Sequence, residues 1–256
     1  MKKIYGPVPS WRLGRSLGID PLSTTEKVCS FNCIYCQLGR TKQKRIKRKL
    51  CVDEKQIGKE LIGILNKKVP IDIITFSGTG EPTLALNLDK IIKTIKNITD
   101  LPIAILTNST LLNNQKVKSA LMKVDKVVAK LDAWDDQSLR RINDPYASLK
   151  FSDIYEEMVN FRKNYPGSFC LQMMFMKEIR SDFEKLSKLV RKLSPNEVQI
   201  NTPLRPCAVS SLSKKELVKI KKNYFRGLNA FTVYEKDRPQ VKVIDLATTL
   251  KRRPKI

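Results

Sequence analysis

Short runs of β-branched residues alternate with longer amphipathic stretches, and this order limits the possible folds more than any other feature. The run at 71–76 is followed by a stretch at 88–98 whose leucine and isoleucines share one helical face. Predicted strands lie at 71–76, 102–106, 126–131, 169–176 and 196–200, and predicted helices at 54–66, 88–98, 115–122, 152–164, 182–193 and 214–223. With a further short strand before Cys29, about six alternations imply parallel strands joined by right-handed crossovers.

The order of elements predicts an α/β fold, a partial (β/α)6 barrel. A doubly wound open sheet has the same alternation, so the pattern alone leaves both open. Residues 7–14 are too rich in proline and glycine to predict a regular element, and 231–234 and 241–244 predict two strands of an appended hairpin. We therefore expect an N-terminal extension at 1–20, the barrel at 21–228, and a basic C-terminal hairpin and tail at 229–256.

Three of the six cysteines, Cys29, Cys33 and Cys36, crowd into eight residues with the spacing C-x3-C-x2-C. Thiolates are the usual protein ligands of iron–sulfur clusters, and a complete set for a four-iron cube is four. Three thiolates on one loop leave one iron open to a small molecule. The chain contains no histidine, which excludes histidine metal ligands and Ser-His-Asp catalysis.

With Tyr35 just before its last cysteine, this motif resembles that of the radical S-adenosylmethionine (SAM) superfamily. The resemblance implies a [4Fe–4S] cluster on Cys29, Cys33 and Cys36, with the amino and carboxylate groups of SAM on the open iron. It also implies a flavodoxin or ferredoxin as electron donor. Reductive cleavage of SAM would then give a 5′-deoxyadenosyl radical that takes a hydrogen atom from a substrate.

Further polar motifs follow the predicted strands. Residues 77–84 resemble the GGE motif of the superfamily, although Thr79 replaces its first glycine. Ordinary turns and helix caps are the alternative interpretation of these motifs. The resemblance implies that the residues around SAM are Tyr35, Gly78, Gly80, Glu81, Asn108, Lys130, Asp132 and Gln172.

The likeness extends to the segments 5–18, 36–39 and 201–206 and to the Lys-Arg-Arg-Pro tail. These resemble a subgroup of Fe–S oxidoreductases related to the wyosine-forming tRNA enzyme and to the activating enzyme of pyruvate formate-lyase. The shared motifs concern SAM binding, so they do not identify a substrate.

The charge of the chain favours a polyanionic partner. Lysine and arginine number 49 against 25 acidic residues, a formal net charge of +24. A basic run directly follows the cysteine motif and contains Arg40, Lys42, Lys44, Arg45, Lys47, Arg48 and Lys49. We expect these side chains to contact phosphates of an RNA, with tRNA base modification as the leading hypothesis.

Two other functions fit parts of the sequence. A protein or peptide substrate is one, and a non-catalytic zinc-containing RNA-binding protein, with Cys51 as fourth ligand, is the other. The clustered cysteines favour a reducing compartment, and the chain has neither a secretory signal nor an apolar run that spans a membrane. We therefore expect a cytoplasmic protein.

Overall fold

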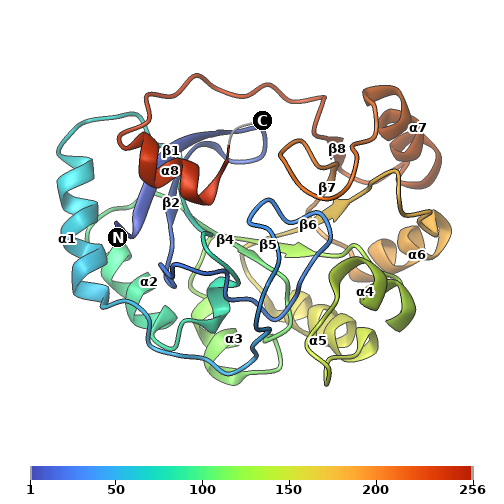
Figure 1. Ribbon diagram of the computed structural model, residues 1–256, viewed down its shortest axis with the longest axis horizontal. Helices are drawn as coiled ribbons and strands as arrows, with labels where there is room; N and C mark the ends of the chain where they lie inside the picture. The colour runs from blue at the N-terminus through green and yellow to red at the C-terminus, as the bar shows by residue number, and fades with distance from the viewer. Residues whose placement is uncertain (1, 255–256) are drawn as a thin grey trace.

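The computed structural model describes residues 2–254, which form a single curled sheet with helices on its outside (Figure 1). The strands are β1 (Ile4–Ser10), β2 (Gly14–Ile19), β3 (Ile73–Phe76), β4 (Ile103–Thr107), β5 (Lys126–Lys130), β6 (Ser168–Met174), β7 (Glu197–Asn201) and β8 (Ala230–Thr232). They lie in sequence order; β1 is antiparallel to β2, and all other neighbours are parallel. The predicted partial barrel is confirmed.

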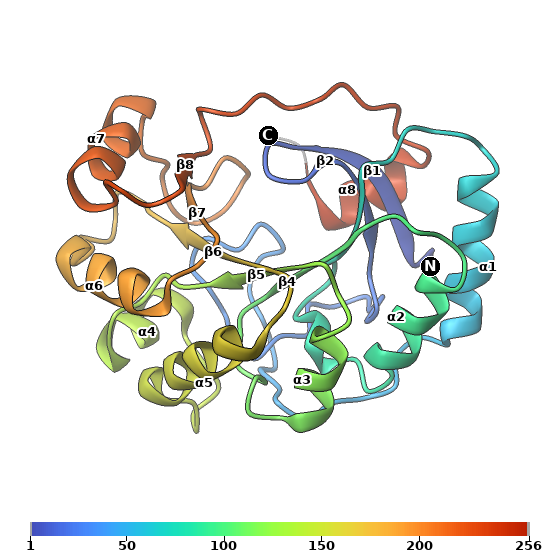
Figure 2. The ribbon, with the colours of Figure 1, turned by 180° about the vertical axis from the view of Figure 1, so that it is seen from behind.

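The helices are α1 (Glu54–Leu65), α2 (Leu88–Lys96), α3 (Gln115–Leu121), α4 (Asp136–Asn143), α5 (Phe151–Asn164), α6 (Phe183–Leu193), α7 (Lys214–Tyr224) and α8 (Leu246–Arg252). Figure 2 shows α1, α2, α3, α5, α6 and α7 following one another around the convex side of the sheet. None of the helices in residues 2–254 has the length and apolarity required to cross a bilayer.

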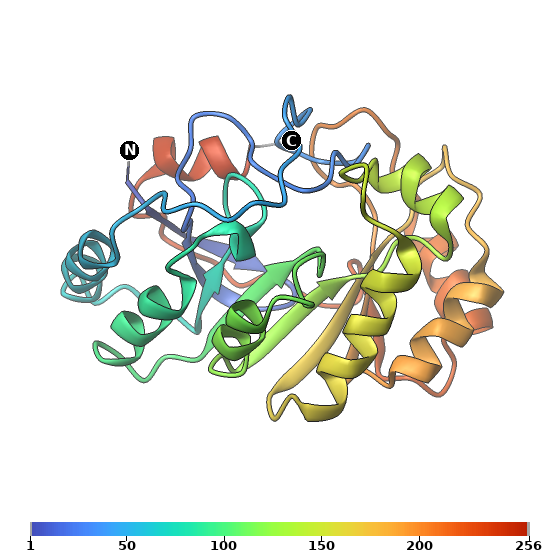
Figure 3. The same cartoon turned by 90° about the horizontal axis from the view of Figure 1, so that it is seen from below.

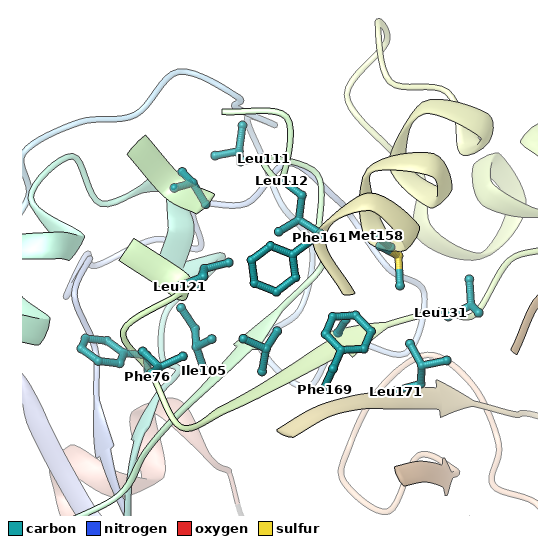
Figure 4. Packing of buried hydrophobic residues seen from close by; sticks show 14 of the residues in the cluster. Phe76, Ile105, Leu111, Leu112, Leu121, Leu131, Met158, Phe161, Phe169 and Leu171 are labelled. Carbon is teal, nitrogen blue, oxygen red and sulfur yellow. The ribbon is translucent and has the colours of Figure 1, made fainter. Parts of the chain in front are cut away.

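The core lies between the sheet and these outer helices (Figure 4). Ile105 of β4 and Phe169 of β6 point toward Leu121 of α3 and toward Met158 and Phe161 of α5, and all five are at most 1% exposed. Burying each such side chain stabilises the fold by roughly 1.5–3 kcal/mol. This packing fixes the helices on the outside and leaves the carboxyl ends of the strands free to form a site.

The prediction that residues 7–14 contain no regular element is wrong. They belong to the hairpin of β1 and β2, and β2 is itself the first parallel strand. The prolines are tolerated because β1 lies at the edge of the sheet and its register shifts between Tyr5 and Val8. At that irregularity the missing N–H of Pro7 does not cost the sheet a hydrogen bond.

The predicted C-terminal hairpin is also wrong. Residues 230–232 extend the sheet as β8, parallel to β7, and 241–244 form no strand. The open edge of β7 offers a complete row of backbone partners, which an isolated two-stranded hairpin does not. The chain then returns along the open side of the sheet to α8, where the Ile244 N–H donates to the Gly6 carbonyl at 2.9 Å (Figure 1). The division into three segments itself stays a prediction.

Candidate active site

The three motif cysteines lie on the long loop between β2 and α1, which passes beside the carboxyl end of β3. The Val28 N–H donates to the Thr79 carbonyl at 3.0 Å, and the Glu81 N–H donates to the Val28 carbonyl at 3.0 Å. A Cβ atom at Gly80 would lie 1.7 Å from the Val28 carbonyl oxygen. Glycine is therefore required at position 80 for the two backbones to come this close.

The end of α4 holds the same loop between its first and last cysteines. The Asn32 N–H donates to the Asn143 carbonyl at 2.8 Å, and the Ile34 N–H donates to the Ile142 carbonyl at 3.1 Å. The cysteine loop is thus bound to the sheet before Cys29 and to α4 on both sides of Cys33.

Two asparagine amides point at the sulfur atoms of this loop. Asn108 Nδ2 lies 3.6 Å from Cys29 Sγ, and Asn143 Nδ2 lies 3.3 Å from Cys33 Sγ. Burial raises the pKa of the Cys29 thiol and of the Cys33 thiol, and the hydrogen bond from Asn143 opposes the rise at Cys33. The two amides therefore stabilise sulfur atoms that must carry negative charge to bind iron.

The residues present fit an iron–sulfur cube better than a zinc ion. Within residues 2–254, no three cysteine, aspartate or glutamate side chains stand within reach of one ion, as a closed zinc site requires. A cube takes each thiolate on a different iron, so its ligands lie farther apart. Cys51, the fourth ligand of the zinc alternative, is exposed, and its thiol contacts the Lys49 carbonyl.

A cavity of 510 Å³ opens at the carboxyl ends of the parallel strands, where barrels of this kind carry their sites. Four of the predicted SAM-binding residues line it, namely Tyr35, Gly78, Lys130 and Gln172, and Cys36 brings the cysteine loop to its wall. The structure therefore places these five residues, from four different segments, around one space.

The other four predicted residues, Gly80, Glu81, Asn108 and Asp132, lie outside the cavity wall. Both carboxylate oxygens of Glu81 are occupied: one accepts from the Thr83 N–H and hydroxyl and from the Thr107 hydroxyl, and the other accepts from the Asn108 N–H at 2.7 Å. Burial raises the pKa of Glu81, and these hydrogen bonds oppose the rise. In this arrangement Glu81 joins the ends of β3 and β4.

Asp132 lies behind one wall of the cavity and binds the side chains that form that wall. Its carboxylate accepts from the Tyr35 hydroxyl, from Asn143 Nδ2 at 3.2 Å and from the Met174 N–H at 2.7 Å, and Lys130 Nζ lies 3.3 Å away. Burial, followed by the charge of Asp132, raises the pKa of Tyr35 well above its usual value, so the phenol stays protonated. Lys130 Nζ also lies 4.7 Å from the centre of the Tyr35 ring.

The basic run after the motif divides into two groups. Lys42 pairs with Glu26 at 2.7 Å, Lys44 pairs with Asp144 at 2.6 Å, and Arg48 donates to the carbonyls of residues 83 and 85. Lys44 and Arg48 hold the loop in place, whereas the Lys42–Glu26 pair is exposed on both sides and contributes little. The other four, Arg40, Arg45, Lys47 and Lys49, form no ion pair within residues 2–254.

Asn143 is a site residue that the sequence analysis missed, because the helix that carries it was not recognised. The signal was present in the capping box of α4, in which the Asp135 carboxylate accepts from the Ser138 N–H at 2.8 Å.

The match to known families decides which of the sequence interpretations holds. The Radical SAM superfamily matches residues 25–190, which include all three motif cysteines. The chain belongs to the radical SAM superfamily. A UPF0026 protein of Synechocystis sp. is 42% identical over 79% of this chain and 76% of its own length. A UPF0026 protein of Methanocaldococcus jannaschii is 40% identical over 79% of this chain and 64% of its own length.

Solved radical SAM structures share the fold. Streptococcus suis SuiB bound to its precursor peptide SuiA superposes with a TM-score of 0.65, at 14% identity over 86% of this chain and 49% of that one. TYW1 with a lysine-pyruvate adduct gives a TM-score of 0.59, at 18% identity over 83% of this chain and 74% of that one. This radical SAM enzyme uses a [4Fe–4S] cluster and SAM as cofactors.

Proposed function

We propose that this radical SAM enzyme acts on RNA, with a tRNA base as the source of the hydrogen atom. Cys29, Cys33 and Cys36 would hold the cluster, and SAM bound beside it would supply the 5′-deoxyadenosyl radical. Tyr35, Gly78, Lys130 and Gln172 border SAM in the cavity, while Glu81, Asn108 and Asp132 position the cluster loop and the cavity wall. A flavodoxin or ferredoxin supplies the electron.

The observation that carries the RNA proposal is the charge of the cavity wall. The cavity is lined by six cationic side chains and by no aspartate or glutamate: Arg12, Lys130, Arg205, Arg238, Arg252 and Arg253. Lys130 lies 3.3 Å from the Asp132 carboxylate and Arg252 pairs with the buried Asp20, so the other four are the wall cations without an ion pair in the described residues. Such a wall attracts an anionic substrate and repels a cationic one. The four unpaired basic side chains of the run at 40–49 and the net charge of +24 add attraction for a polyanion.

We also propose a cytoplasmic location. None of the six cysteines forms a disulfide, which supports a reducing compartment such as the cytoplasm.

The test is anaerobic reconstitution, followed by measurement of tRNA binding and of 5′-deoxyadenosine formation with and without total tRNA. We expect tRNA to accelerate 5′-deoxyadenosine formation and its affinity to fall steeply as salt rises, because each neutralised phosphate releases counterions. Salt-independent or undetectable binding contradicts the proposal. Acceleration by a cell extract that survives ribonuclease but not protease treatment would assign a protein or peptide substrate instead.

A further inference from the structure

Three arginines of the cavity wall come from segments that are far apart in the chain. Arg12 lies in the turn between β1 and β2, Arg205 lies in the loop after β7, and Arg253 directly follows α8. Figure 3 shows α8 and the cysteine loop on the same side of the sheet, and Gln37 Nε2 donates to the Arg252 carbonyl at 2.8 Å. The fold therefore brings three arginines to the wall of one cavity beside the cluster loop.

These three guanidinium groups form no ion pair within the described residues. Arg12 Nη1 donates to Gln199 Oε1 at 3.3 Å, and Arg205 Nη1 donates to the Pro254 carbonyl at 2.6 Å. The Nε atoms of Arg12 and Arg253 are buried without any hydrogen-bond partner. Arginine has five N–H donors, so most of the donors in this group have no partner among residues 2–254.

The local electrostatics are unfavourable for these side chains when the cavity is empty. Burial, followed by the charge of Arg253, lowers the pKa of Arg12 to about 10 and that of Arg205 to about 10, so both remain charged at neutral pH. Burial also lowers the pKa of Arg253. The charge of Glu197 opposes the shift at Arg12, but its carboxylate already binds Lys236 at 3.6 Å and Gln199. Like charges without a counter-charge in a partly desolvated wall are costly unless an anion joins them.

We propose that Arg12, Arg205 and Arg253 form a phosphate-binding pocket that grips one phosphate group of the substrate while the cluster end of the cavity holds SAM. Arginine suits this role because its planar fork of donors matches phosphate oxygens. The pocket rests on the proposed RNA function for its natural ligand, which is then a phosphodiester of the target nucleotide. A free nucleotide offers the same chemistry, so the two sources are separated by experiment.

The first experiment measures inorganic phosphate binding by calorimetry on the reconstituted, SAM-saturated enzyme. Arg12→Gln, Arg205→Gln and Arg253→Gln are each expected to weaken phosphate binding at least tenfold. Arg226→Gln removes one charge from an exposed position outside the cavity and is expected to bind phosphate as the unaltered enzyme does. Competition between phosphate and SAM, or equal binding by all variants, overturns the proposal.

The second experiment separates the pocket from the identity of the substrate. If RNA is the source, tRNA accelerates 5′-deoxyadenosine formation in the unaltered enzyme and in Arg226→Gln but much less in Arg205→Gln. If nucleoside monophosphates accelerate it and tRNA does not, the pocket stands and the RNA function falls. Thermal melting tests whether the pocket variants still fold. Replacing Arg12, Arg205 or Arg253 by glutamine removes a buried charge that has no counter-charge, so without ligand these variants should melt no lower than the unaltered protein. Phosphate should raise the melting temperature only of proteins in which the pocket is intact. Variants that melt far lower contradict the proposal, because the arginines are then structural.

Discussion

Arg252 and Asp20, which are 232 residues apart, form an ion pair at 2.8 Å in which both side chains are at most 1% exposed. The Asp20 carboxylate also accepts from the Thr79 N–H at 3.2 Å, and Arg252 Nη2 donates to the Lys2 carbonyl at 2.8 Å. This pair ties α8 to the end of β2 and to the glycine-containing loop after β3. α8 is therefore fixed beside the cavity, whose wall includes Arg252 and Arg253.

Replacing Arg252 by methionine should destabilise the protein by about 3–5 kcal/mol, because it leaves the Asp20 charge buried without its partner. The measurement is the free energy of unfolding from urea denaturation. Lys251→Met, an exposed change on the same helix, is the control and should shift the value by no more than about 0.5 kcal/mol. Equal small effects from both variants would show that the pair does not anchor the tail.

Gly80→Ala should prevent the cysteine loop from seating beside β3, since its Cβ would lie 1.7 Å from the Val28 carbonyl oxygen. We expect most of the bound iron and the brown absorbance to be lost after reconstitution. Gly63→Ala is the matched control: its added Cβ would meet no side chain or backbone beyond its own helical turn, so iron content should stay unchanged. In α1 this change should also stabilise the fold by about 0.4–1 kcal/mol. Full iron loading of Gly80→Ala would show that the cysteine loop does not need the close contact between Gly80 and Val28.

Asn143→Ala removes an amide donor 3.3 Å from Cys33 Sγ. A hydrogen bond to sulfur stabilises the more negative, reduced cluster, so its loss should lower the reduction potential. We expect SAM cleavage to slow by about 10–100-fold, the usual cost of losing a residue that supports a metal ligand. An electron paramagnetic resonance redox titration measures the potential, and Asn160→Ala on the exposed side of α5 is the control. An unchanged potential in Asn143→Ala would remove Asn143 from the site.

Cys51→Ser should leave the cluster intact, because this thiol is exposed and its described contact is with the Lys49 carbonyl. Iron and sulfide analysis should give the same content as the unaltered protein. Cys33→Ser, by contrast, should lose the cluster. Stoichiometric zinc that depends on Cys51 would return the protein to the non-catalytic alternative.

The parallel part of the fold was predictable because each buried strand and each amphipathic helix carries its own periodic pattern. The helix predicted at 88–98 is α2 (Leu88–Lys96), and the strand predicted at 126–131 is β5 (Lys126–Lys130). The two ends of the chain were mispredicted for different reasons. β1 contains prolines that only an edge position allows, and β8 pairs with β7 rather than with the nearby run at 241–244.

The site was predictable where chemistry depends on local spacing and not where it depends on tertiary contact. The cysteine motif and Tyr35 share one loop, so their spacing was informative. Asn143, and the arginines at positions 12, 205 and 253, reach the site only through the fold. The segments that carry the three arginines were part of the family likeness, but their sequences did not show that they meet at one cavity. The capping residues of α4 were a usable signal, and recognising that helix would have pointed to its final residue.

The most direct test of the account is anaerobic reconstitution with iron and sulfide, followed by strong reductant and SAM. The account predicts four irons per chain and release of 5′-deoxyadenosine and methionine in equal amounts. Both should disappear when Cys29, Cys33 or Cys36 is replaced by alanine. A loaded, reduced protein that leaves SAM intact, or a cluster that survives the loss of any of these cysteines, would contradict it.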